Sequence, residues 1–165
     1  GAGRYDRIKK GTLQSMIVMG GIVLCGVGLG MLLTVNDLYF HVFLSADKVT
    51  AETVRFGNAL LYVDFAMYPF LGGVFLIRNC VQGIGRPSFV LGAGAAELVA
   101  RIAVCLLLPA AVAGGMVSAS APPLAFYALC AADPMAWIAA DTVLCVPLIR
   151  NIMRMDYRYL RSGQI

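Results

Sequence analysis

Charged side chains are scarce in this sequence, at 13% of its 165 residues, whereas a soluble domain carries about 25%. Apolar residues make up 60%. The 26 residues from Gly11 to Asn36 contain no Asp, Glu, Lys or Arg, and about 20 apolar helical residues cross the ~30 Å core of a bilayer. This composition excludes an ordinary soluble domain. It predicts an all-α, polytopic integral membrane protein.

Residues that carry enzyme chemistry are equally scarce. The chain has one histidine, His41, and five cysteines in apolar stretches without a CxxC motif. No nucleophile is paired with a histidine, and neither a metal-ligand cluster nor a phosphate-binding loop is recognisable. We therefore expect no enzymatic activity, no bound metal and no cofactor.

The apolar stretches predict about four membrane-spanning helices. The first stretch is too long for the apolar core of a signal peptide, and no small-residue cleavage site follows it. Gly26 and Gly30 in this stretch form a GxxxG pair, which favours close helix packing. The predicted spans are 13–35, 56–82, 88–110 and 124–148.

Local signals mark the ends of these spans. Ser45 or Thr50 is expected to cap the second helix, and the third helix is expected to start after Pro87. The Pro122-Pro123 pair suits the first turn of the fourth. Pro134 and Pro147 are expected to break that last helix.

Basic residues are distributed unequally between the two sides of the membrane. The N-terminal segment, the turn after the second span and the C-terminal tail together hold ten, against two on the other side. Because Lys and Arg collect in the cytoplasm, both ends of the chain are expected there. The ten are Arg4, Arg7, Lys9, Lys10, Arg78, Arg86, Arg150, Arg154, Arg158 and Arg161, and the two are Lys48 and Arg55.

Four motifs in order carry a family resemblance. They are GAGRYDRIKKG at 1–11, MYPFLGGVFLIRNCVQGIGR at 67–86, ELVARI at 97–102 and DPMAWIAAD at 133–141. With these strings the chain resembles the C-terminal portion, helices nine to twelve, of a MATE-type multidrug and toxin extrusion transporter.

The resemblance implies a twelve-helix transporter of two six-helix bundles in a bacterial inner membrane. Such a protein is a multidrug efflux antiporter that exports cationic or amphiphilic drugs and other xenobiotics, driven by sodium or proton entry. Four helices complete neither bundle, and the sequence begins at Gly1 without an initiator Met. We therefore expect a fragment that does not transport alone. Its partners would be the lipid bilayer, the small-molecule substrate and the missing N-terminal helices.

Glu97 and Arg101 are the clearest charged pair within a span. They are four residues apart and share a helical face, with the acid preceding the base. The pair either lowers the cost of inserting the helix or lines a cleft where Glu97 attracts a cation or exchanges a proton. We expect the two to be coupled, so that removing both restores folding lost when one is removed.

Asp64 is the sharper candidate for ion coupling. In sodium-coupled members of the resembled family an acid on the tenth helix belongs to the cation site, but that position falls nearer Leu71 here. Asp64 therefore either couples transport or only solvates an outer cleft. Tyr68, with Pro69 and Gly72 after it, either moves with a kink or packs.

Two further acids lie in the last span. Asp133 is expected at the depth of Asp64, where it satisfies backbone groups freed by Pro134. Asp141 is a further candidate for substrate or coupling-ion binding, with a partner on a helix outside this chain.

Two alternative functions stay open. One is a lipid-linked oligosaccharide flippase of the same superfamily, which would be expected to carry more basic residues in its cleft. The other is a small membrane subunit that assembles with or anchors a partner.

The charge distribution makes a topology prediction. In a background without native cysteines, an impermeant thiol reagent added outside should label Lys48→Cys or Val117→Cys and spare Lys9→Cys or Arg158→Cys. Labelling of Lys9→Cys from outside would contradict the predicted orientation.

Overall fold

The computed structural model describes residues 5–115 and 121–161. Within these ranges, the side chains of residues 5, 6, 8, 9, 36, 46 and 151–161 are not described. Position 117 of the labelling prediction lies outside the described residues, as do the side chains at positions 9 and 158.

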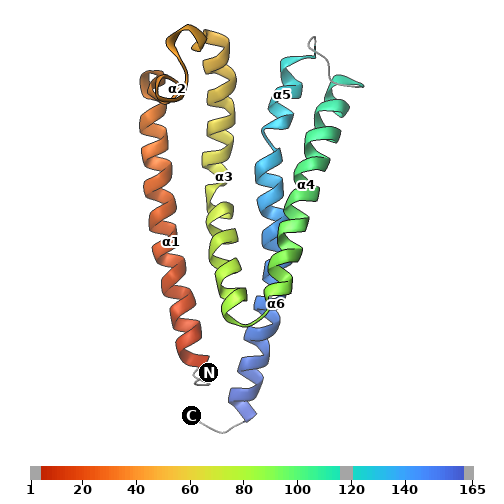
Figure 1. The fold of residues 1–165 in the computed structure, drawn as a ribbon. Coiled ribbons are helices and arrows are strands. Elements are labelled where there is room, and N and C mark those ends of the chain that lie inside the picture. The colour runs from red at the N-terminus through yellow and green to blue at the C-terminus, as the bar shows by residue number, and fades with distance from the viewer. Residues whose placement is uncertain (1–4, 116–120, 162–165) are drawn as a thin grey trace.

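Every regular element in the described ranges is a helix. Four long helical segments stand side by side, joined by short turns and by the 3₁₀ elements η1 and η2 (Figure 1). The elements are α1 (Tyr5–Thr34), η1 (Val35–Asp37), α2 (Leu38–Phe43), η2 (Ala46–Lys48), α3 (Ala51–Gly83), α4 (Pro87–Ala113), α5 (Pro123–Leu129) and α6 (Ala132–Arg161).

Four segments are long and apolar enough to cross a membrane, as the sequence predicted. The all-α, polytopic fold class is thereby confirmed. The helix α1 begins and α6 ends at the same end of the bundle, and we call the opposite end the α2 end (Figure 1). The spanning segments are Lys10–Thr34, Ala51–Gly83, Pro87–Ala113 and Pro123–Arg150.

The helix ends follow from local chemistry. Thr50, and not Ser45, caps α3, because its hydroxyl accepts a hydrogen bond from the Thr53 N–H at 3.2 Å. Between α3 and α4 the chain reverses through Gly85, whose φ of 79° favours glycine. The next helix starts at Pro87 itself, where the missing N–H is not needed.

The last span is interrupted just before the first of its two prolines. Its break lies at Cys130 and Ala131, between α5 and α6. Pro134 sits in the first turn of α6, where no N–H is required. Pro147 lies inside the continuous α6, so the expected break there is wrong.

The core sits where α3, α4 and α6 meet. Trp137, Ala140 and Leu144 of α6 pack against Val74 of α3 and Ala93 of α4, and all five are buried. By contrast, α1 packs on α3 and leaves many apolar side chains exposed, as suits a helix surrounded by lipid.

The close contact between α1 and α3 requires glycine, but at only one of the two positions of the GxxxG pair. A Cβ on Gly30 would overlap the Phe65 ring, whereas a Cβ on Gly26 would meet no described atom within 4 Å. Further along, a Cβ on Gly72 would lie 2.8 Å from Cγ2 of Val23. The α1–α3 packing therefore depends on Gly30 and Gly72.

This contact predicts a stability difference between two glycines of one helix. Gly30→Ala should destabilise the protein by about 1–3 kcal/mol, because the methyl group forces the Phe65 ring to shift. Gly28→Ala is the matched control, since its Cβ has no described atom within 4 Å. Thermal unfolding midpoints in detergent should fall only for Gly30→Ala, and equal losses in both variants would contradict the packing.

Candidate functional site

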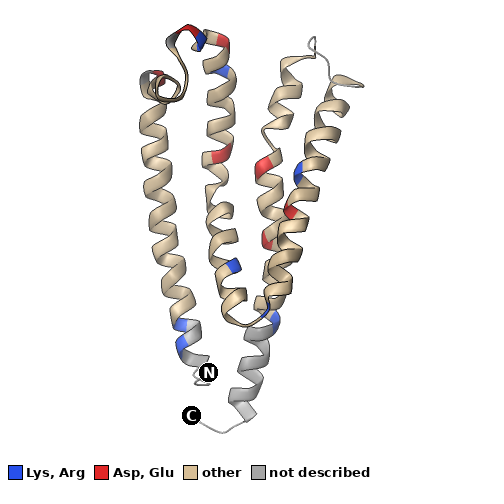
Figure 2. Ribbon diagram, viewed as in Figure 1, with Lys and Arg blue, Asp and Glu red and all other residues tan. Residues whose placement is uncertain are grey.

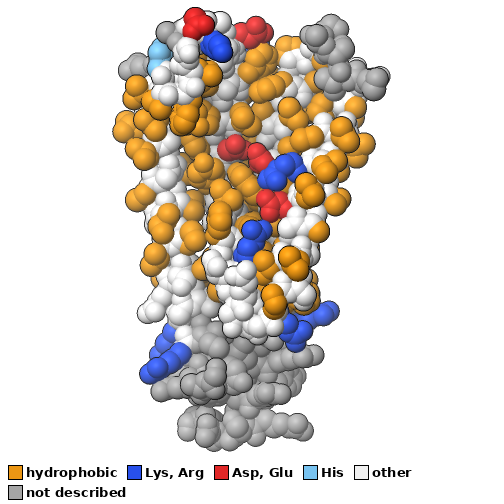
Figure 3. Space-filling view, in the orientation of Figure 1, with side chains coloured by type: hydrophobic (Ala, Val, Ile, Leu, Met, Phe, Trp, Pro, Cys, Tyr) orange, Lys and Arg blue, Asp and Glu red, His pale blue; other side chains and the backbone are white. Residues whose placement is uncertain are grey.

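Charged side chains meet in the middle of the bundle. Acidic and basic positions occur along the central parts of α3, α4 and α6 (Figure 2). In the space-filling view they form a run across one face, surrounded by hydrophobic side chains (Figure 3). The charged residues in the middle parts of these three helices are Asp64 and Arg78 on α3, Glu97 and Arg101 on α4, and Asp133 and Asp141 on α6.

Four of these residues form a continuous network, which we call the charge network: Arg78, Glu97, Arg101 and Asp133. Arg78 Nη2 donates to Glu97 Oε2 at 3.2 Å, and Arg101 Nη2 donates to Glu97 Oε1 at 3.3 Å. Arg101 Nε donates to Asp133 Oδ1 at 2.8 Å. The predicted pair of Glu97 and Arg101 is confirmed, and it lies at the centre of a chain of charges linking α3, α4 and α6.

Two members of the network had been given other roles from the sequence. Arg78 was counted with the basic residues of the turn after the second span, although the predicted span 56–82 includes it, and the structure places it within α3, which continues to Gly83. Without it, nine basic residues remain against two, so the charge imbalance keeps its sign. Asp133 was assigned to backbone groups freed by Pro134, whereas its carboxylate accepts a hydrogen bond from Arg101.

The charge network is only partly covered by this chain. The side chains of Arg101 and Asp133 are 37% and 42% exposed, although both belong to membrane-spanning segments. Ionised groups within a bilayer face a water-filled cavity or other protein rather than lipid. The face seen in Figure 3 is therefore directed toward water or another protein surface.

Asp64 lies beside the network without an ion-pair partner in the described part of the chain. Its Oδ1 is buried and accepts no hydrogen bond there. It interacts electrostatically with Asp133, which agrees with the equal depth expected for the two acids. Tyr68, one turn further along α3, packs edge-on against Trp137 with ring centroids 6.3 Å apart.

Asp141 is a second carboxylate with a buried, unpartnered oxygen. Its Oδ1 accepts no hydrogen bond from the described residues. Its Oδ2 faces α3, where a Cβ on Gly73 would lie 2.9 Å away. Glycine at position 73 therefore makes room for this carboxylate between α3 and α6. A partner for Asp141 outside this chain stays a prediction.

The four acids differ in how their charge is compensated within the described part of the chain. No group of three or more His, Cys, Asp or Glu side chains within the described ranges is arranged to hold a metal ion. Asp64 and Asp141 are neutral only when each binds a proton or another cation. Glu97 and Asp133 are already neutralised by the two arginines.

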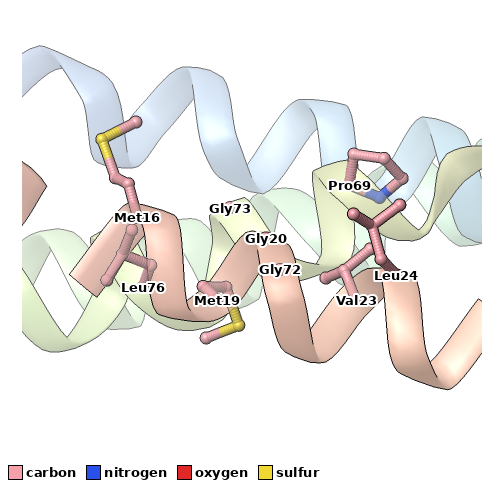
Figure 4. A pocket seen from close by; sticks show the side chains of 9 residues that line it. All are labelled: Met16, Met19, Gly20, Val23, Leu24, Pro69, Gly72, Gly73 and Leu76. Carbon is pink, nitrogen blue, oxygen red and sulfur yellow. The ribbon is translucent and has the colours of Figure 1, made fainter. Parts of the chain in front are cut away.

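A groove of about 280 Å³ lies elsewhere, between α1 and the kinked part of α3 (Figure 4). It offers no charged or hydrogen-bonding side chain, so it cannot neutralise a cation. The candidate site is therefore the charged face and not this groove. The groove is lined by Met16, Met19, Gly20, Val23, Leu24, Pro69, Gly72, Gly73 and Leu76.

Comparison with known proteins identifies no relative: no family model, no curated protein and no solved structure matches the chain. The class that the fold defines is a helical, multi-pass membrane protein with charges in its spans.

The charge network predicts the effect of removing its central base. Arg101→Gln should lower the folded amount in membranes, because Asp133 loses its partner and a charge-assisted hydrogen bond contributes about 1.5–3 kcal/mol. Arg86→Gln, at an exposed position in the turn before α4, is the control and should leave the folded amount unchanged.

A second substitution in the Arg101→Gln protein distinguishes an isolated Glu97–Arg101 pair from the four-residue charge network. Adding Asp133→Asn to Arg101→Gln should restore folding, because Glu97 keeps Arg78 as its partner. Adding Glu97→Gln should restore less, because Arg78 and Asp133 are then both unpaired. Fluorescence-detected gel filtration measures the folded amount, and a better rescue by Glu97→Gln would contradict the network.

Proposed function

We propose that this chain is part of a cation-coupled exporter of the MATE type that moves cationic or amphiphilic xenobiotics out of the cell. The observation that carries the proposal is the excess of acids among the intramembrane charges. Asp64, Glu97, Asp133 and Asp141 stand against two arginines. After the ion pairs are made, Asp64 and Asp141 remain available to bind cations.

The cost of charge in a membrane supports this assignment. An ionised side chain at mid-membrane costs about 2.5–3.5 kcal/mol on insertion scales, and such residues commonly mark ion pathways and proton relays. Asp64 lies near an ion-paired acid, Asp133, yet has no base of its own among the described residues. A coupling site needs such a carboxylate, because it can bind a sodium ion or proton and later release it.

The open charged face supports transport of an organic cation. Its acids attract positive charge, and Tyr68 and Trp137 supply aromatic surface near Asp64. Aromatic faces favour bulky cations. Glu97 and Arg101 would line the cleft as a structural pair, while Asp64 and Asp141 would exchange the coupling ion.

The order of the four sequence motifs is the reason that the proposal names the MATE family. In that arrangement the chain would supply helices nine to twelve, and the face carrying the charge network would look toward the missing bundle. The excess of basic residues near the α1 start and the α6 end favours a cytoplasmic location for both ends in a bacterial inner membrane.

Two other functions have an observation in their favour. A lipid-linked oligosaccharide flippase gains a second intramembrane base, Arg78, beyond the single Arg101 counted from the sequence. Both arginines are neutralised by acids, however, so neither of the two is free to bind an anionic lipid. A small assembling subunit is favoured by the partly exposed network, which a partner helix would cover.

The proposal predicts that Asp64→Asn in the protein made from its complete reading frame weakens ion-driven efflux while expression stays nearly unchanged. The amide has a similar size but no charge to bind a cation. Dye efflux from vesicles with an imposed sodium or proton gradient measures this loss, at matched protein levels.

Glu52→Gln is the matched control, since it removes an exposed acid from the first turn of the same helix. It should leave efflux unchanged under both gradients. Efflux by Asp64→Asn equal to that of the parent under both gradients would remove Asp64 from the coupling mechanism.

A further inference from the structure

Aromatic rings join α3 to the short helix α5 at the α2 end of the bundle. The Phe56 ring of α3 lies 4.8 Å from the Phe126 ring and 6.0 Å from the Tyr127 ring, measured between centroids. The Arg55 guanidinium lies 4.7 Å above the Phe56 ring. We call Phe56, Phe126 and Tyr127 the aromatic closure, because these rings hold α5 against α3.

The break between α5 and α6 separates the aromatic closure from the rest of the last span. The Cys130 N–H donates to the Phe126 carbonyl at 3.1 Å, which ends α5, and the Met135 N–H donates to the Ala131 carbonyl at 3.1 Å, which begins α6. Pro134 has no N–H to donate to the Cys130 carbonyl. The two helices are therefore joined over Cys130 and Ala131 without a continuous ladder of helical hydrogen bonds.

Different interactions hold the helices on the two sides of the break. On one side, Asp133 in the first turn of α6 is tied to α4 by the 2.8 Å contact with Arg101. On the other side, α5 has the sequence PLAFYAL and so contains no carboxylate, ammonium or guanidinium group with which to make an ion pair. It is held by packing against α4 and by the aromatic closure on α3.

Asp64 lies further along α3 than these rings, toward the middle of the bundle. It follows Phe56 by eight residues on α3, about 12 Å along the helix axis. It also interacts electrostatically with Cys130, so the break lies near the carboxylate.

We propose that α5 is a gate over Asp64. It turns about Cys130 and Ala131, and separation of the Phe56, Phe126 and Tyr127 rings opens a path from the α2 end to the carboxylate. The inference relies on the proposed function only for the purpose of the gate, because access to position 64 can be measured without transport.

The test measures how fast a thiol at position 64 reacts. Asp64→Cys is introduced into the protein from which the native cysteines have been removed. An impermeant maleimide is then added on the side of the vesicle membrane where the α2 end lies. Phe56→Leu in this background should speed labelling about tenfold, because aromatic pairs stabilise the closed state by about 0.5–1.5 kcal/mol each and 1.4 kcal/mol is a factor of ten. Phe75→Leu removes an exposed ring from the same helix and should leave the rate unchanged.

A separate variant tests the proposed hinge at Cys130 and Ala131. Pro134→Ala supplies an N–H for the Cys130 carbonyl and favours a continuous helix, so it should slow labelling severalfold. Phe126→Leu repeats the closure test from the other helix if Phe56→Leu folds poorly.

Three labelling results would contradict the proposed gate. Labelling of the Phe56→Leu and Phe126→Leu proteins at the parent rate would exclude the closure, and an unchanged rate for Pro134→Ala would exclude the hinge. Faster labelling only from the opposite end would also exclude it. Labelling as expected, together with normal efflux by Asp64→Asn, would retain the gate and reject coupling at Asp64.

Discussion

The cost of placing charge in a bilayer constrains this molecule more than any other interaction. Each ionised group within a span costs about 2.5–3.5 kcal/mol unless it is paired or hydrated, and α3, α4 and α6 all carry such groups. Within the described part of the chain, Arg78 of α3 and Asp133 of α6 form ion pairs with residues of α4. The register in which these three helices pack brings Glu97 between two arginines, and the apolar core around Trp137 forms in the same register.

Features that depend on neighbouring residues could be predicted from the sequence. The four spans follow from long apolar runs, the Thr50 cap from its hydroxyl at a helix start, and the Glu97–Arg101 pair from a spacing of one helical turn. Arg78 and Asp133 were misassigned because their partners lie on other helices, which no spacing reveals. Of the two breaks expected in the last span, the one near Pro134 occurs, at Cys130 and Ala131, whereas Pro147 is accommodated within α6.

Neighbouring acids differ sharply in their surroundings. Asp133 accepts a short hydrogen bond from an arginine, whereas Asp64, close enough to repel it, has a buried oxygen without a partner in the described residues. A positive charge bound by Asp64 would relieve that repulsion, so its occupancy would bear on the bond between Asp133 and Arg101. If Asp64 exchanges a coupling ion, as proposed, the charged face joins that site to the ion pair of Asp133 and Arg101.

Two adjacent glycines bring α3 into close contact with two other helices. Gly72 receives Val23 of α1, and Gly73 receives the Asp141 carboxylate of α6. Successive residues point about 100° apart around a helix, so the two neighbours press on different sides of α3. Pro69 leaves the Phe65 carbonyl without its helical hydrogen bond just before this point. A side chain added at position 72 would therefore push against α1, and one added at position 73 would push against α6, so this single step of α3 limits how closely both helices can approach it.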